Sequence, residues 1–159
     1  QHWTQNRYAL SRRLWQALCI NNMNELLKAT LEAIELESDN LDKSFALVDT
    51  LIEKYGEKNI ASRLYSDIEP YVSEHVISDL FGILLWSTSD NGCELMRTME
   101  NWLIEAQSER QIKIALSLEA YPFHDINKME QVLKVISSKY PKLESLCNNT
   151  ISSRKESDA

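Results

Sequence analysis

One segment of the chain is apolar on nearly every side of a helix, and it constrains the fold more than any other feature. Residues 74–87 read EHVISDLFGILLWS, with apolar side chains at Val76, Ile77, Leu80, Phe81, Ile83, Leu84 and Leu85. A helix of this kind is stable in water only when other elements cover most of its surface. We therefore expect it to lie at the centre of the domain, with amphipathic helices around it.

The rest of the chain shows the periodicity of amphipathic helices. Apolar residues recur at intervals of three or four, and only three glycines and three prolines are available to interrupt them. No segment shows the alternation of apolar and polar residues that is typical of a half-buried strand. The sequence predicts an all-α fold of about nine helices, over residues 4–20, 22–37, 41–55, 58–66, 74–87, 93–106, 109–120, 126–140 and 142–154.

Turn residues mark several of these boundaries. Asp39 or Asn40 can cap the helix that Gly56 ends, and Asp125 can cap the helix that Pro141 ends. The joins are short, so consecutive helices are expected to be antiparallel neighbours. Two arrangements stay open: a short HEAT-like array of stacked antiparallel pairs, or a compact multi-helix bundle. About nine helices favour the array, because a simple four-helix bundle uses fewer.

The length of the chain suits one folded unit. A chain of 159 residues can bury one good hydrophobic core. Residues 1–151 are expected to form a single helical domain. The polar sequence SSRKESDA at 152–159 predicts a disordered, solvated C-terminal tail.

The charge balance is acidic, with the larger excess in the first half. The chain has 24 acidic residues against 17 lysines and arginines, a net charge of −7. Residues 1–80 contain 13 of the acids and 8 of the bases. This balance disfavours nucleic acid and anionic membranes as direct partners, since both attract basic surfaces. It suits a basic protein partner.

The sequence also predicts the cellular compartment of the protein. No apolar run approaches the roughly 18 residues of a membrane span, and the first residues, QHWTQNRY, lack the apolar region of a signal peptide. The widely spaced Cys19, Cys93 and Cys147 have apolar neighbours, which predicts reduced, buried thiols. We expect a cytoplasmic protein without a membrane span.

No motif for a catalytic or metal centre is visible. His2, His75 and His124 are far apart and the glycines are isolated, so neither a metal site nor a phosphate-binding loop is predicted. His124 beside Asp125 is the best candidate for acid–base chemistry, but a loop residue before a helix cap explains the pair more simply. We expect a protein that is not an enzyme and needs no cofactor or metal.

Acidic residues and one tryptophan are the candidates for binding a partner. The acids gather within 25–42 and 57–79, either as a solvated surface or as a face that attracts a basic partner. Trp86 ends the apolar helix one step off its core stripe, so it is either a core-edge residue or a partner-facing anchor. Trp102 is expected in the core. The candidate partner-binding residues are Glu32, Glu35, Glu37, Asp39, Asp42, Glu69, Glu74, Trp86 and Asp90.

The segment LFGILLWSTSDNGCELMRTMENWLIEA, followed by RQIKIALSLEAYPFHDINKMEQVLKVI, resembles small helical, HEAT-like bacterial immunity proteins of polymorphic toxin and contact-dependent growth inhibition systems. The resemblance lies in the succession of helices and turns over about residues 20–150. It implies stoichiometric neutralisation of a cognate toxin, often a nuclease, in the cytoplasm of the producing cell. The acidic first half suits that role, because nucleases are basic where they hold nucleic acid.

Three functions follow from these features. The leading expectation is a non-enzymatic inhibitor whose acidic face and aromatic anchors cover a basic toxin. The alternative is a helical-repeat adaptor or scaffold that binds peptide segments of other proteins. The third is an enzyme that uses His124 with a nearby carboxylate.

Overall fold

The structure, a computed structural model, describes residues 24–36 and 41–159 and is helical throughout that part of the chain. Its elements are α2 (Glu25–Leu36), α3 (Asp42–Tyr55), α4 (Ile60–Asp67), α5 (Glu74–Ser87), α6 (Cys93–Glu105), α7 (Glu109–Leu116), α8 (Ile126–Lys139), a 3₁₀ turn η1 (Pro141–Leu143) and α9 (Glu144–Ser157). Eight α-helices and no strand among these residues confirm the predicted all-α fold. The helix predicted over 4–20 and the candidate caps Asp39 and Asn40 lie outside the described residues.

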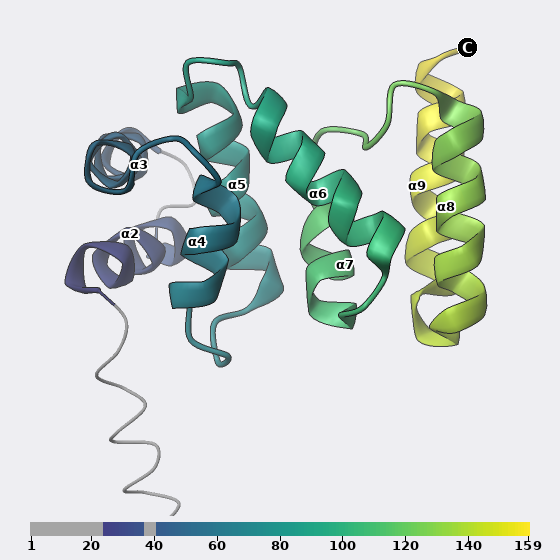
Figure 1. Cartoon of the computed structure of the whole chain (residues 1–159), viewed down its shortest axis with the longest axis horizontal. Helices are drawn as coiled ribbons and strands as arrows, with labels where there is room; N and C mark the ends of the chain where they lie inside the picture. The colour runs from purple at the N-terminus through teal and green to yellow at the C-terminus, as the bar shows by residue number, and fades with distance from the viewer. Residues whose placement is uncertain (1–23, 37–40) are drawn as a thin grey trace, which may run out of the picture.

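The helices form a stack of pairs in two layers. In one layer α4 contacts α6 and α6 contacts α8; in the other α3, α5, α7 and α9 follow one another in contact (Figure 1). Within pairs, α2 contacts α3, α6 contacts α7 and α8 contacts α9. Contacts therefore run mainly between consecutive pairs, as in a stacked array.

Helix α5 is the central element, as its sequence predicts. It contacts α2, α3, α6 and α7. Ser73 caps its start, because the side-chain oxygen accepts a hydrogen bond from the backbone N–H of Val76 at 3.3 Å. Seven of its residues are buried, and the buried Ser78 hydroxyl donates to the carbonyl oxygen of Ile114 on α7 at 2.9 Å.

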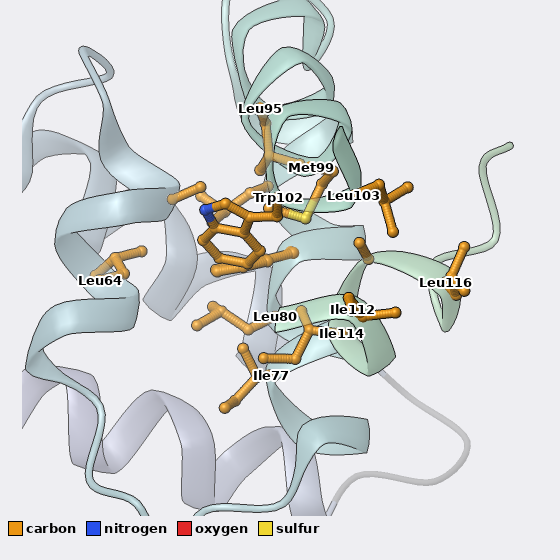
Figure 2. Packing of buried hydrophobic residues seen from close by; sticks show 14 of the residues in the cluster. Leu64, Ile77, Leu80, Leu95, Met99, Trp102, Leu103, Ile112, Ile114 and Leu116 are labelled. Carbon is orange, nitrogen blue, oxygen red and sulfur yellow. The ribbon is translucent and has the colours of Figure 1, made fainter. Parts of the chain in front are cut away.

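Trp102 lies in the core, which confirms its prediction. Figure 2 shows the indole among side chains from neighbouring helices, including Leu80 of α5 and Ile114 of α7. Its ring centroid is 5.0 Å from that of Tyr65 and 6.1 Å from that of Phe81, in tilted arrangements. Aromatic pairs in such geometry are favourable beyond the apolar area that they bury.

Several predicted helix ends are confirmed. The Asp125 side chain accepts from the backbone N–H of Asn127 at 2.8 Å and caps α8. Gly56 follows α3 with a φ of 73°, a conformation that glycine adopts without strain. Helix α8 ends at Lys139, just before Pro141, because proline cannot continue a helix.

The prediction of a disordered tail from residue 152 is wrong. Helix α9 continues to Ser157 because polar side chains near its end have partners. The Arg154 guanidinium donates to the carbonyl oxygens of Phe123 and His124 at 3.3 and 3.1 Å, and Arg154 pairs with Asp158 at 2.7 Å. The segment is therefore helical to Ser157, held through Arg154 by the loop before α8, although its other side chains are exposed.

The prediction of buried thiols is wrong for Cys93. Cys147 is buried in α9, and burial raises the pKa of its thiol, but Cys93 is exposed. Cys93 is the first residue of α6, and the buried side of that helix is formed by Leu95 and Met99. Cys19 lies outside the described residues.

Candidate partner-binding surface

The fully exposed side chains of α5 lie along one face of the helix. They are His75, Asp79 and Trp86, and together with the half-buried Gly82 between them we call them the α5 stripe. These positions are separated by four, three and four residues, so at 100° per residue they lie above one another on the helix. Most other residues of α5 face the core. The stripe is thus the part of the central helix that is open to another molecule.

Trp86 is the most exposed large apolar side chain of the described residues. Its exposed fraction is 83%, against 7% for Trp102. Of the two interpretations left open by the sequence, the core-edge position is therefore wrong. An indole that packs on nothing leaves a large apolar surface in water, and tryptophan in such positions is enriched where proteins bind one another.

Gly82 leaves an open notch one turn before Trp86. A Cβ placed on Gly82 would meet no atom within 4 Å, apart from its chain neighbours and the backbone of its own helix. Glycine within a helix makes the helix less stable than alanine at the same position would, by roughly 0.5–1 kcal/mol. Packing among the described residues does not require that loss, and none of their atoms fills the space beside the indole.

Asp79 supplies a carboxylate on the other side of the notch. Its Oδ2 lies 3.6 Å from Nε2 of His75, and the side chains of Asp79 and His75 are 48% and 82% exposed. His75 is one turn before Asp79, and Gly82 is one turn after it. The stripe therefore presents, in order, an imidazole, a carboxylate, a gap and an indole.

The acidic excess lies toward the end of the stack formed by α2 and α3, which contact the central helix α5. Described residues up to Ser87 carry 11 acids and 5 bases, whereas residues 88–159 carry 11 acids and 9 bases. On α2 and α3, two of the four helices that contact α5, the exposed acids are Glu25, Glu32 and Glu35 of α2, and Asp42, Asp49 and Glu53 of α3. The long-range field of this end is therefore negative.

The structure divides the predicted partner-binding acids into groups. Glu32, Glu35 and Asp42 are exposed on α2 and α3, where they contribute to the acidic end; Glu37 and Asp39 lie outside the described residues. Glu69 and Glu74 are half-buried near the start of α5, and Glu74 is about 18 Å along the helix axis from Trp86. The structure does not bring these two together with the tryptophan.

Asp90 holds the turn that follows Trp86. Its carboxylate accepts from the backbone N–H of Glu94 at 2.8 Å and of Gly92 at 3.0 Å. The hydrogen bond from Glu94 is the main reason that the pKa of Asp90 is below its usual value. Asp90 thus fixes the start of α6, which is a structural task.

Sequence reasoning missed Asp79 and Gly82 as candidates. The signal was present: polar or glycine residues at 75, 79 and 82 share one helical face with Trp86 in an otherwise apolar segment. Asp79 belongs to the acidic cluster within 57–79, where it counts as one charge among many.

Other chemistry has little support in the described part of the chain. It contains no group of three or more His, Cys, Asp or Glu residues that could hold a metal ion. His124 is exposed, and its neighbour Asp125 is engaged as the cap of α8. Among the described residues, no helix is long and apolar enough to cross a membrane.

No protein-family model matches the sequence, and no curated protein or solved structure is significantly similar to it.

Proposed function

We propose that this protein is an immunity protein that binds a cognate toxin, of the nuclease class, and neutralises it by covering its basic surface. The observation that carries the proposal is the 83% exposed indole of Trp86 on the central helix. A rigid aromatic side chain on a buried helix loses little conformational entropy when a partner covers it.

The charge distribution supports the same proposal. The excess of acids over bases in helices α2 to α5 faces solvent on α2 and α3. A negative field of this kind attracts a basic partner before contact and speeds association, while the aromatic anchor contributes after contact. A nuclease domain suits this field because it must be basic where it binds phosphates.

The proposed action requires no turnover. The inhibitor occupies the surface that would hold nucleic acid, in a one-to-one complex within the cytoplasm of the producing cell. Polymorphic toxin and contact-dependent growth inhibition systems, whose immunity proteins this sequence resembles, supply such a toxin beside its inhibitor.

Co-expression with the neighbouring toxin tests the proposal. The proposal predicts a large toxin-bearing open reading frame directly upstream of the gene, and the C-terminal domain that it encodes is induced in cells with and without this chain. We expect rescue of growth by the wild-type protein, and reduced rescue by Trp86→Ala at equal protein level. The proposal fails if the domain is toxic and the wild-type chain gives no rescue.

A helical-repeat adaptor is the second candidate, because the stacked helix pairs also form an open groove. The groove has a volume of about 300 Å³, beside the start of the loop after α7 and the outer side of α9, and is lined by Leu116, Leu118, Glu119, Ala120, Tyr121, Pro122, Asn149, Thr150 and Ser153. An adaptor would bind several peptides and would not protect cells. Capture of one stoichiometric basic protein would favour the inhibitor.

A further inference from the structure

We infer that the α5 stripe binds an arginine side chain of the partner, with the guanidinium in the notch over Gly82, between the carboxylate of Asp79 and the indole of Trp86. This inference rests on the proposed function, because it assigns the group that the basic partner inserts.

The spacing of the three residues fits this occupant. Gly82 is three residues after Asp79 and four before Trp86, and positions at these intervals are neighbours on a helix surface. Asp79 and Trp86 are separated by about 10.5 Å along the axis. A planar guanidinium entering between them can contact the exposed indole and reach the carboxylate of Asp79, in place of the exposed His75 imidazole that lies 3.6 Å from Oδ2.

The notch is open on the side of Trp86 as well. Side chains on helices lean toward the preceding turn, so an indole could have covered Gly82. No atom of Trp86 lies within 4 Å of the Cβ position of Gly82, and the indole keeps 83% of its surface exposed. Both the gap and the ring are therefore accessible to the same incoming group.

Arginine fits this site better than lysine. The guanidinium stacks flat on an aromatic ring and at the same time donates in-plane hydrogen bonds to a carboxylate. An ammonium group is a compact, strongly hydrated charge and cannot make both contacts with one planar face. A neutral side chain of the same shape would lose the attraction to Asp79.

The choice of glycine is explained by this occupant. Alanine at position 82 would stabilise the helix and would meet nothing within 4 Å. A side chain there would, however, stand in the path of a group that lies on the helix backbone. The glycine is thus a requirement of binding and not of folding.

The test uses blocked tripeptides, Gly-Arg-Gly, Gly-Lys-Gly and Gly-citrulline-Gly, titrated into the whole protein at constant low salt. The indole N–H resonance of Trp86, assigned by its loss in Trp86→Phe, reports binding. We expect a saturable shift with the arginine peptide, at least about twofold weaker binding of the lysine peptide, and no shift with citrulline.

Variants separate this site from general attraction to an acidic protein. Asp79→Asn should weaken binding of the arginine peptide about two- to fivefold, and Gly82→Leu should abolish it with the helical circular dichroism unchanged. Glu105→Gln, which removes one exposed acid at the end of α6, should leave it unchanged.

The inference is overturned by no shift with the arginine peptide, by an equal shift with citrulline, or by unchanged binding in Asp79→Asn. If the peptide does not bind while the chain still protects cells from the toxin, this inference alone fails. If the peptide binds and no toxin is neutralised, the proposed function fails and the arginine site stands.

Discussion

Gly92 lies directly against Leu85 where α5 turns into α6. A Cβ on Gly92 would be 2.5 Å from Cδ2 and 2.9 Å from Cα of Leu85, and the φ of Gly92 is 74°. Both the close approach and the left-handed backbone require glycine at this position. Gly82 differs on both counts, since it lies within α5 and a Cβ there would meet open space.

Replacement of Gly92 and of Gly82 by alanine should therefore change the free energy of unfolding in opposite directions. Gly92→Ala should lower the free energy of unfolding by about 2 kcal/mol, because the Leu85 backbone cannot move away and the positive φ is strained. Gly82→Ala should raise it by about 0.5–1 kcal/mol. Urea denaturation followed by circular dichroism measures both, and changes of the same sign would contradict the account.

Replacement of Trp102 and of Trp86 by alanine should distinguish a residue that stabilises the fold from one that binds a partner. Trp102→Ala should destabilise the fold by about 3–5 kcal/mol, because it leaves a cavity beside Tyr65 and Phe81. Trp86→Ala should change the free energy of unfolding by less than about 0.5 kcal/mol, because the indole is exposed. A large loss of stability in Trp86→Ala, measured by the same urea titration, would show that the indole supports the fold.

The hydrogen bonds that the Asp90 carboxylate accepts at the start of α6 predict that the stability of the fold depends on pH. The pKa of this carboxyl is lowered mainly by the hydrogen bond from the Glu94 backbone N–H, so the ionised form stabilises the folded state. This contribution is fully present above the ordinary value of 3.8 and is lost as the pH falls through the lower pKa of the folded protein. Asp90→Ala should lose about 1 kcal/mol at neutral pH.

Urea denaturation of the parent and Asp90→Ala at several pH values between neutrality and acid provides the measurement. The difference between the two proteins should shrink below pH 3.8. Asp90→Asn, which keeps an acceptor oxygen without the charge, should lie between them. A difference that stays constant down to strongly acidic pH would exclude the ionised cap.

The acidic end should govern the rate of association with a basic partner. Reversal of Glu32, Glu35 and Asp42 to lysine should slow association about tenfold at low salt and flatten its dependence on ionic strength, with the fold intact. The matched control reverses Glu105, Glu119 and Glu144, which lie outside α2 and α3 and change the net charge equally. Stopped-flow mixing gives the association rates of both variants. Equal slowing in both would show that the net charge of the protein, and not the position of these acids, sets the rate.

The fold was predictable because local rules and packing agree along this chain. The apolar segment that forms α5 could be stable only at the centre, and the start of α8 follows from a short-range signal, the capping residue Asp125. The end of α9 was not predictable in this way. It depends on the hydrogen bond from Arg154 to the carbonyl oxygen of Phe123, whose φ is 62°. No local sequence pattern predicts this contact.

The candidate site was predictable in part. Trp86 could be recognised at the border of the apolar segment, but its exposure depends on which neighbours pack around the last turn of α5. Gly82 becomes informative only when the space beside it is known to be empty. Clusters of acids along the sequence were a weaker guide, because Glu69 and Asp90 lie on different elements from Glu32.

The affinity of the purified protein for the toxin domain encoded beside it tests the central claim most directly. Isothermal titration is performed with the wild-type chain and with Trp86→Ala, after equal stability of the two has been established. If the α5 stripe is the centre of the interface, the dissociation constant should rise at least about 30-fold in the variant. An unchanged dissociation constant would place the interface elsewhere and contradict the account.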